Sequence, residues 1–201
     1  HGQLQVLMAA ANTASLEMNT GAGKLIKTSF NDDGTFKGKV NISGTGELKI
    51  NGDVYTRINN VTELQAINDH IETIGGDDYV TGNYYLGANI DASATSGWNA
   101  GAGFVPLGRY HLGTSGLWHA NTNFAGNFQG FGHIITSLTI NTDLTSAGEY
   151  GATGLFGQVG GTTDVTISNL GLTGATIQGK QYTGGLIGKV QSDNGVSITN
   201  T

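Results

Sequence analysis

The sequence contains no cysteine, and Pro106 is its single proline. The lack of cysteine excludes a disulfide framework and any metal site built on thiolates. It is typical of a cytosolic protein, and it equally suits a secreted chain that stays unfolded while it passes through a pore. The scarcity of proline suits a sheet protein, because most backbone N–H groups in a sheet must join hydrogen-bonded ladders.

Charge is also sparse, since charged residues make up 12% of the chain and the formal net charge is −6. A nucleic-acid partner or an anionic membrane surface would require clustered lysine and arginine, so neither is expected. No apolar run approaches the roughly 18 residues of a membrane-spanning helix, and no signal peptide is visible, so membrane insertion is not expected. The chain begins at His1 and stops within a repeat, and we interpret it as a fragment of a longer protein.

Glycine, in contrast, supplies 34 of the 201 residues, more than twice its average share of about 7%. Part of this glycine marks a repeat, because residues 154–157 (GLFG) return 31 positions later as residues 185–188 (GLIG). The same offset relates Val159 to Val190, Val165 to Val196, Ile167 to Ile198 and Asn169 to Asn200. A partial third copy, at an offset of 32, carries Ile135, Leu138 and Ile140 onto Ile167, Leu170 and Leu172. Such self-similarity predicts a stacked, solenoid-like fold.

The repeated segments contain short runs of Ile, Val, Leu and Thr with period two, separated by Gly, Asn and Asp. Short strands of this kind cannot bury an apolar face alone, but strands stacked about 4.8 Å apart form a continuous inner column. The sequence therefore predicts an all-β fold, a right-handed parallel β-helix. We expect residues 56–201 to form it, and residues 1–55 to be a β-rich N-terminal segment of flanking rungs or a hairpin layer.

Two local signals refine this prediction. Asn51-Gly52 lies between alternating apolar runs and predicts a tight turn that joins two strands. Residues 62–74 predict the one helix, an excursion that lies against the outside of the β-helix or over one end. Thr62 and Gln65 have the spacing of a capping box, an apolar stripe follows, and Gly75-Gly76 is typical of a helix end.

The same residues resemble a known family. The GLFG and GLIG units are similar to GLUG repeats, and residues 124–140 (FAGNFQGFGHIITSLTI) resemble a rung of filamentous-haemagglutinin-type adhesins. Residues 64–93, with LQAIND followed by YYLGANIDAS, resemble a second stretch of those adhesins. Gln129 departs from the family pattern, which usually has aspartate there. The resemblance covers roughly residues 55–201 and implies a high-molecular-weight adhesin exported by two-partner secretion.

The most unusual loop spans residues 96–123 and concentrates aromatic and hydrogen-bonding side chains. Its candidate ligand-binding residues are Trp98, Arg109, Tyr110, His111, Trp118 and His119. Aromatic faces stack on sugar rings while neighbouring polar groups bind hydroxyls, which favours an exposed glycan-binding platform. The alternative is that these aromatics pack back onto the flank of the solenoid, because tryptophan is on average highly buried.

Other patterns do not favour a metal, a cofactor or catalysis. His111, His119 and His133 have no standard zinc spacing, and His133 is expected to make a structural hydrogen bond in its turn. The repeats lack the recurring carboxylate and basic partner of polysaccharide-acting β-helix enzymes. Asn41 and Asn60 each begin an Asn-x-Ser/Thr tripeptide, and the resemblance permits glycosylation at both.

Together these features predict a non-enzymatic segment of a large secreted or cell-surface bacterial adhesin, a virulence factor that mediates attachment to host cells or surfaces. The segment is expected to act as a rigid β-helical stalk that displays binding loops. The resemblance implies two kinds of partner: a host-cell receptor or glycan, and an outer-membrane secretion partner for the parent chain. The alternatives are a fragment of a polysaccharide-acting β-helix enzyme and the stalk of a toxin-delivery exoprotein.

Overall fold

The computed structural model describes most of the chain and shows largely β-structure. The described residues are 4–7, 15–19, 37–44, 46–108, 111–112, 118–119, 122–144, 151–192 and 194–201. No helix within these ranges is long and apolar enough to cross a membrane.

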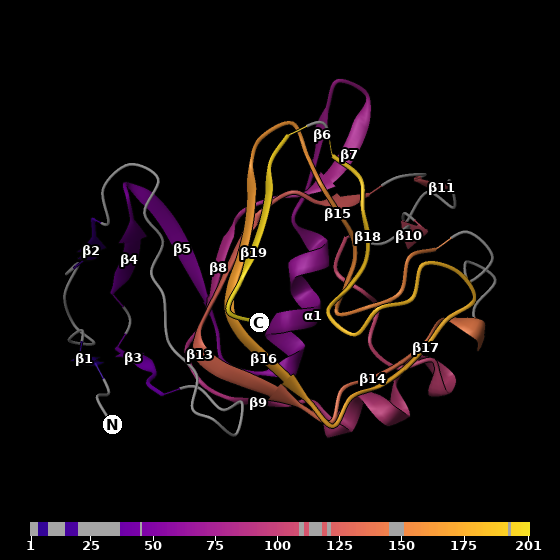
Figure 1. Cartoon of the computed structure of the whole chain (residues 1–201), viewed down its shortest axis with the longest axis horizontal. Helices are drawn as coiled ribbons and strands as arrows, with labels where there is room; N and C mark the ends of the chain where they lie inside the picture. Colours follow the sequence, from indigo (N-terminus) through magenta and orange to yellow (C-terminus); the bar gives the residue numbers. More distant parts are fainter. Residues whose placement is uncertain are drawn as a thin grey trace.

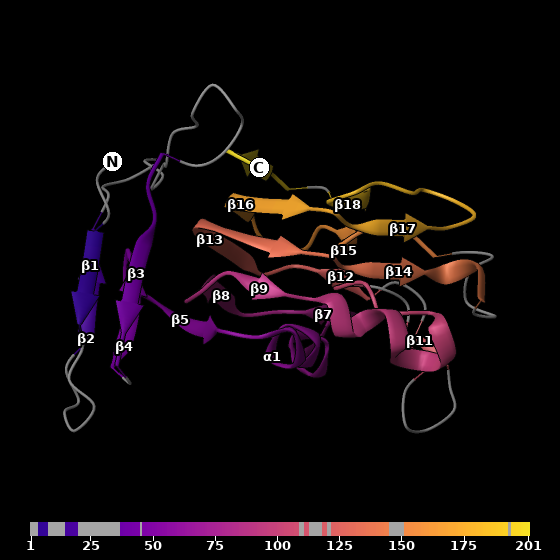
Figure 2. The same cartoon turned by 90° about the horizontal axis from the view of Figure 1, so that it is seen from below.

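Parallel strands from successive passes of the chain lie side by side in three series. The first contains β5 (Asp53–Ile58), β8 (Asn83–Leu86), β13 (Asn127–Thr136), β16 (Val165–Thr173) and β19 (Val196–Thr199), with β9 (Ile90–Asp91) beside β13. The second contains β7 (Asp77–Val80), β12 (Asn123–Phe124), β15 (Phe156–Val159) and β18 (Ile187–Val190). The third pairs β14 (Thr139–Asn141) with β17 (Thr176–Gln178). The series follow three sides of the main body (Figure 1), and successive passes form layers (Figure 2).

Antiparallel hairpins interrupt this parallel arrangement. β4 (Glu47–Ile50) pairs with β5, β6 (Ile71–Ile74) pairs with β7, and β10 (His111–Leu112) pairs with β11 (Trp118–His119). The sheets are therefore mixed, and they do not close on themselves. The prediction of an all-β fold is confirmed, and the parallel β-helix stays a prediction.

The main apolar core lies between the three series of strands. Its aromatic centre consists of Phe124, Phe128 and Phe156, each at most 1% exposed. The Phe156 ring lies 4.8 Å from the Phe124 ring and 5.5 Å from the Phe128 ring, measured between centroids. Aliphatic side chains, together with Tyr84 and Phe104, fill the rest of this core.

The two ends of this core differ. Helix α1 (Val61–Ala66) lies beneath the first layer (Figure 2), and its Leu64 is 0% exposed within the main core. One of the two placements expected for the helix, over an end of the stack, is thus confirmed. At the opposite end, in β18 and β19, Val190 is 51% exposed and Ile198 is 41% exposed. The core is covered by a helix at one end and partly open at the other.

The 31-residue repeat is confirmed as a structural register. Ile167 lies directly beside Ile198 in neighbouring parallel strands, and Phe156 lies beside Ile187. The upstream copy with an offset of 32 is wrong, because Ile167 pairs instead with Phe128, 39 positions earlier. The register of β13 against β16 shifts between Gln129 and His133, where a bulge places extra residues in β13. The spacing between paired residues changes wherever a bulge or a longer connection adds residues, so no single offset describes every pass of the chain.

The predicted helix over 62–74 is correct only in its first half. The chain forms α1, then a 3-10 turn at Ile67–Asp69, and then strand β6. Gly75 and Gly76 both have positive φ, and they form the two-residue turn of the β6–β7 hairpin rather than a helix end. The expected apolar stripe does not continue, since Ile71 and Ile74 are 41% and 38% exposed.

The capping box also lies elsewhere than predicted. Asn60, rather than Thr62, is the N-cap residue of α1, and its Oδ1 accepts a hydrogen bond from the Glu63 N–H at 2.9 Å. In return, Glu63 Oε2 accepts from the Asn59 N–H at 2.7 Å. The arrangement is a variant of the capping box, two residues nearer the N-terminus, in which Glu63 accepts from the residue before the N-cap rather than from the N-cap itself.

The N-terminal strands form a layer beside the main body (Figures 1 and 2). β1 (Leu4–Leu7) pairs in parallel with β3 (Val40–Ser43), and β2 (Ser15–Met18) pairs in parallel with β4. Asn51 and Gly52, with φ of 53° and 93°, form the predicted tight turn into β5. A second apolar cluster joins this layer to the main body and contains Ile42, Leu48, Ile50, Tyr85 and Phe131. The division at residue 55 stays a prediction, since β5 spans that position.

Candidate functional site

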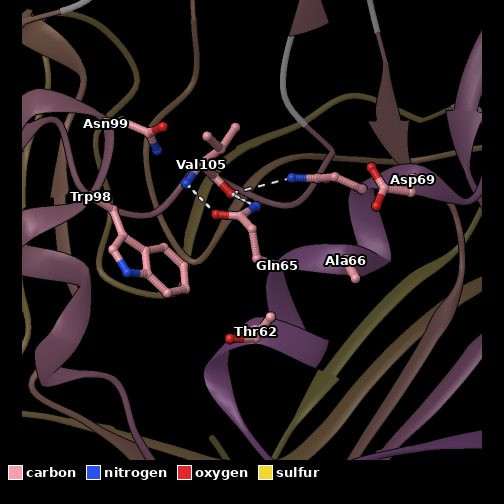
Figure 3. A pocket seen from close by; sticks show the side chains of 8 residues that line it. Thr62, Gln65, Ala66, Asp69, Trp98, Asn99 and Val105 are labelled. Atoms are coloured by element: carbon pink, nitrogen blue, oxygen red, sulfur yellow. Dashed lines mark hydrogen bonds between the residues drawn. The ribbon is translucent and has the colours of Figure 1, made fainter.

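A groove of about 490 Å³ lies between α1 and the 3-10 segment η2 (Ser93–Gly101). Its lining residues come from both elements and from the chain that follows them (Figure 3): Thr62, Gln65, Ala66, Asn68, Asp69, Trp98, Asn99 and Val105. Its volume falls within the range of about 300–1,000 Å³ that is typical of small-molecule sites.

Two amide side chains of the helical segment fix the floor of this groove. Gln65 Oε1 accepts a hydrogen bond from the Val105 N–H at 2.8 Å, and Gln65 Nε2 donates to the Val105 carbonyl at 3.1 Å. The Gln65 amide therefore pairs with the Val105 backbone as a neighbouring strand would. Asn68 repeats this three residues on, because its Oδ1 accepts from the Gly108 N–H at 3.2 Å and its Nδ2 donates to the Pro106 carbonyl at 3.1 Å. These bonds hold the helix at a fixed distance from the facing chain.

Trp98 forms a wall of the groove beside the Gln65–Val105 pair (Figure 3), and its half-buried indole packs against the main core. The next two residues, Asn99 and Ala100, have φ of 52° and 55°. This left-handed conformation costs roughly 1–2 kcal/mol for a residue with a Cβ. The Gly103 N–H donates to the Trp98 carbonyl at 3.0 Å, and Asn99 Nδ2 donates to the Gly103 carbonyl at 2.7 Å. Strained backbone persists only where its surroundings fix it, so the backbone that follows Trp98 is held in one conformation.

The charge in the groove is small and negative. Asp69, which is exposed, is the one charged residue among the described residues that line it, and the others are amides, a hydroxyl and apolar groups. No lysine or arginine of the described chain lines it. An anionic ligand would therefore find no charge partner here, whereas a neutral ligand with hydroxyl groups would find both donors and acceptors.

The structure brings only part of the predicted ligand-binding set to this groove. Trp98 lines it, whereas Arg109 and Tyr110 lie outside the described residues. The backbone of the β10–β11 hairpin pairs His111 with His119 and places Trp118 opposite Leu112, and the side chains of this hairpin are not described. The prediction of a binding loop over 96–123 thus stays a prediction, for Trp98 as for the other residues.

Sequence reasoning missed the helical side of the groove. The sequence places Gln65 in a capping box and indicates no role for Asn68, whereas in the structure both hydrogen-bond to residues about 40 positions away in the chain. The signal that was present is their spacing, since two amide side chains at i and i+3 share one face of a helix. Two amide side chains at this spacing are a reason to look for a facing chain.

The two predicted glycosylation positions differ in accessibility. Asn60 is exposed at the start of α1, and its Nδ2 donates a hydrogen bond to Glu63 Oε1 at 2.7 Å. Asn41 is half-buried within β3, where it lies opposite Gln5 of β1. Modification of either residue stays a prediction, and the geometry favours Asn60.

His133 has the structural role expected of it. It is 3% exposed, with Nδ1 at 3.3 Å from Asn89 Oδ1 and Nε2 at 3.2 Å from the Val40 carbonyl oxygen. It therefore connects the N-terminal layer to β13. Burial lowers the pKa of His133, the hydrogen bond to Val40 raises it, and nearby Lys39 lowers it further, with a net downward shift. The described part of the chain contains no cluster of three or more residues that could hold a metal ion.

No family model and no solved structure matches the chain. One known protein matches this chain over most of the chain's length. The chain is similar to halomucin. It is 32% identical over 185 residues to this protein of Haloquadratum walsbyi, and the match covers 90% of the chain. The chain spans about 2% of the length of halomucin, so it matches a small stretch of a far larger protein.

Proposed function

We propose that the chain is a non-enzymatic segment of a large secreted or cell-surface adhesin, folded as a right-handed parallel β-helix. The observation that carries this proposal is the in-register stacking of equivalent side chains, with Val165 beside Val196 and Ile167 beside Ile198. Such a stack lengthens by adding passes of the chain at a constant cross-section, which produces a stiff rod. The similarity to a stretch of halomucin supports a place within a far longer protein, and the word mucin in that name supports a location outside the cell.

The finer proposal places the chain with the GLUG-containing, filamentous-haemagglutinin-type adhesins of two-partner secretion. It is supported by the GLFG and GLIG units, which lie on neighbouring passes with Phe156 beside Ile187. Gln129 stands where the family has aspartate, yet its Oε1 still accepts a hydrogen bond from the Phe131 N–H two residues on, at 3.1 Å. The partners in this proposal are a host-cell receptor or glycan and an outer-membrane secretion protein.

A stalk role needs no catalytic groups, and the groove offers little for catalysis. Acid–base attack on a polysaccharide requires a carboxylate with a second acid, base or cation close to the same bond. Asp69 is the single carboxylate among the described groove residues, and no lysine, arginine or histidine lines the groove beside it. This supports a binding or spacing role over the alternative of an enzyme.

The test of the proposed function is antibody labelling of intact cells that produce the parent protein. Antibodies raised against the purified chain are expected to label unpermeabilised cells, and brief protease treatment of those cells is expected to remove the signal. An antibody against a cytoplasmic protein serves as the control for leakage. Labelling that appears only after permeabilisation would overturn the surface location. Beads coated with the chain that adhere to host cells no better than beads coated with albumin would overturn the adhesive role.

A further inference from the structure

We propose that the groove between α1 and Trp98 binds a neutral pyranose ring, stacked on the indole and hydrogen-bonded by the groove's amide, hydroxyl and carboxylate groups. This deepens the proposed function by naming a ligand class, and it rests on that function for the biological source of the sugar. The proposal uses three features of the groove: a fixed aromatic wall, a fixed polar floor and the absence of cationic side chains among its described residues.

The aromatic wall is the first feature. The C–H bonds on one face of a pyranose are apolar, and they pack against the electron-rich face of an aromatic ring. Trp98 is held for such a contact, since its half-buried side chain packs against the main core, and its carbonyl and the Asn99 amide are hydrogen-bonded to Gly103. A ligand that binds a pre-oriented indole loses less conformational entropy than one that must order it.

The polar floor is the second feature. Thr62, Asn99 and Asp69 also line the groove, and they bring a hydroxyl, an amide and a carboxylate to it. Sugar hydroxyls both donate and accept, so side chains with both capacities suit them better than a row of like charges. Gln65 and Asn68 already use their amides to hold Val105, Pro106 and Gly108, so they define the shape of the floor.

The charge of the groove excludes the two nearest alternatives. A uronate or other acidic sugar would place its carboxylate near Asp69 with no described cation to balance it, which costs binding energy. A quaternary ammonium ligand calls for a cage of several aromatic rings, whereas Trp98 is the single aromatic residue among the described lining. A neutral pyranose needs neither an opposite charge nor a cage.

The test uses the two tryptophans of the chain as separate reporters in a ¹⁵N–¹H correlation spectrum of the purified chain. The indole N–H peak that disappears in Trp98→Leu belongs to Trp98, and the remaining peak belongs to Trp118. Methyl pyranosides of glucose, galactose and mannose are titrated to about 50 mM, since a single stacking site is expected to bind with a Kd on the order of 1 mM. Sodium glucuronate and choline chloride are titrated in parallel at matched ionic strength.

At least one neutral pyranoside is expected to shift the Trp98 peak with saturation, and Trp98→Leu is expected to weaken its binding at least tenfold by calorimetry. Tyr182→Leu, which removes an aromatic residue that is 56% exposed and does not line the groove, is expected to bind as the unaltered chain does. Asp69→Asn, whose fold is checked by its thermal melt, is expected to weaken binding of the neutral sugar less than fivefold.

Four outcomes would overturn the inference. The first is a shift of the Trp118 peak alone, which would move the site to the loop predicted from sequence. The second is binding of choline or glucuronate that is tighter than binding of the neutral pyranosides. The third is unchanged binding in a folded Trp98→Leu variant, and the fourth is no shift with any pyranoside. Because the experiment uses the purified chain, its failure leaves the surface location untouched. Failure of antibody labelling would likewise leave the sugar site standing.

Discussion

Asn169 offers the sharpest test of the stacked arrangement. It is 0% exposed, has a φ of 54°, and lies in a ladder of amide side chains that crosses three passes of the chain. Its Nδ2 donates to Gln129 Oε1 at 2.7 Å on one side, and its Oδ1 accepts from Asn200 Nδ2 at 3.1 Å on the other. The ladder therefore joins β13, β16 and the end of the chain through a single buried amide.

Replacement of Asn169 by alanine removes the side-chain hydrogen bonds and raises the conformational energy of the backbone. Leaving buried partners without a hydrogen bond costs about 1–3 kcal/mol. Alanine also tolerates the left-handed conformation less well than asparagine, which adds about 1 kcal/mol. We expect Asn169→Ala to lower the free energy of unfolding by about 2–4 kcal/mol. Asn169→Gly loses the same hydrogen bonds without the backbone strain, so it is expected to be more stable than the alanine variant.

The assay is urea unfolding followed by circular dichroism, with the midpoint compared at an unchanged m-value. Asn200→Ala is the matched control, because Asn200 has almost the same φ, 53°, but is only half-buried in the last pass. It is expected to cost about 1 kcal/mol, less than Asn169→Ala. The reasoning fails if Asn169→Ala unfolds within about 0.5 kcal/mol of the unaltered chain, or if the glycine variant is the less stable of the two.

Three further predictions address the core, the histidine and the helix cap. Phe156→Ala is expected to cost about 3–5 kcal/mol in urea unfolding, because the ring is fully buried between two others, whereas Val190→Ala at the open end is expected to cost less than about 1 kcal/mol. Burial lowers the pKa of His133 below its ordinary value of 6.5, so its contribution to stability is full above that pH and is lost as the pH falls below it. Unfolding midpoints at pH 7.5 and 5.5 are therefore expected to differ less in His133→Gln than in the unaltered chain, and an equal difference would contradict the assignment. Asn60→Ala is expected to lower stability by about 1 kcal/mol and Asn60→Ser to restore most of it, as judged by thermal melts; equal melts for all three would show that the cap contributes nothing.

The sequence repeat correctly predicts which residues lie side by side in the passes where the same side chains recur. Val165 and Val196, or Ile167 and Ile198, occupy the same position in successive passes, so their sequence offset equals their spacing in the structure. The prediction fails at Ile135, which pairs with Leu172, because the connection from Asn141 to Phe156 is longer than the equivalent one from Gln178 to Ile187. Sequence periodicity reports registers only where the connecting lengths stay constant.

Two other failures have local physical causes. Gly75-Gly76 suits both a helix end and a two-residue hairpin turn. The hairpin forms because β6 pairs with β7, and this pairing is not visible in the local sequence. The groove could not be predicted because Gln65 and Val105 are 40 positions apart and meet only after the stack has formed. Residue type alone points to Trp98, whereas the residues that line the groove with it depend on tertiary structure.

The parallel pairing described above also determines how this chain reaches its native state. Partners in parallel strands are separated by at least 28 positions, as for Ile58 and Leu86, and by as many as 45, as for Ile90 and Ile135. To form each pair, the chain must first close a long loop and lose conformational entropy, which the new contacts compensate only afterwards. Folding times of milliseconds to seconds are therefore expected. The β4–β5 and β6–β7 hairpins close over only a few residues, so they are expected to nucleate first, one on each side of helix α1. A refolding chain would then grow outward from the helix-covered end, one pass at a time.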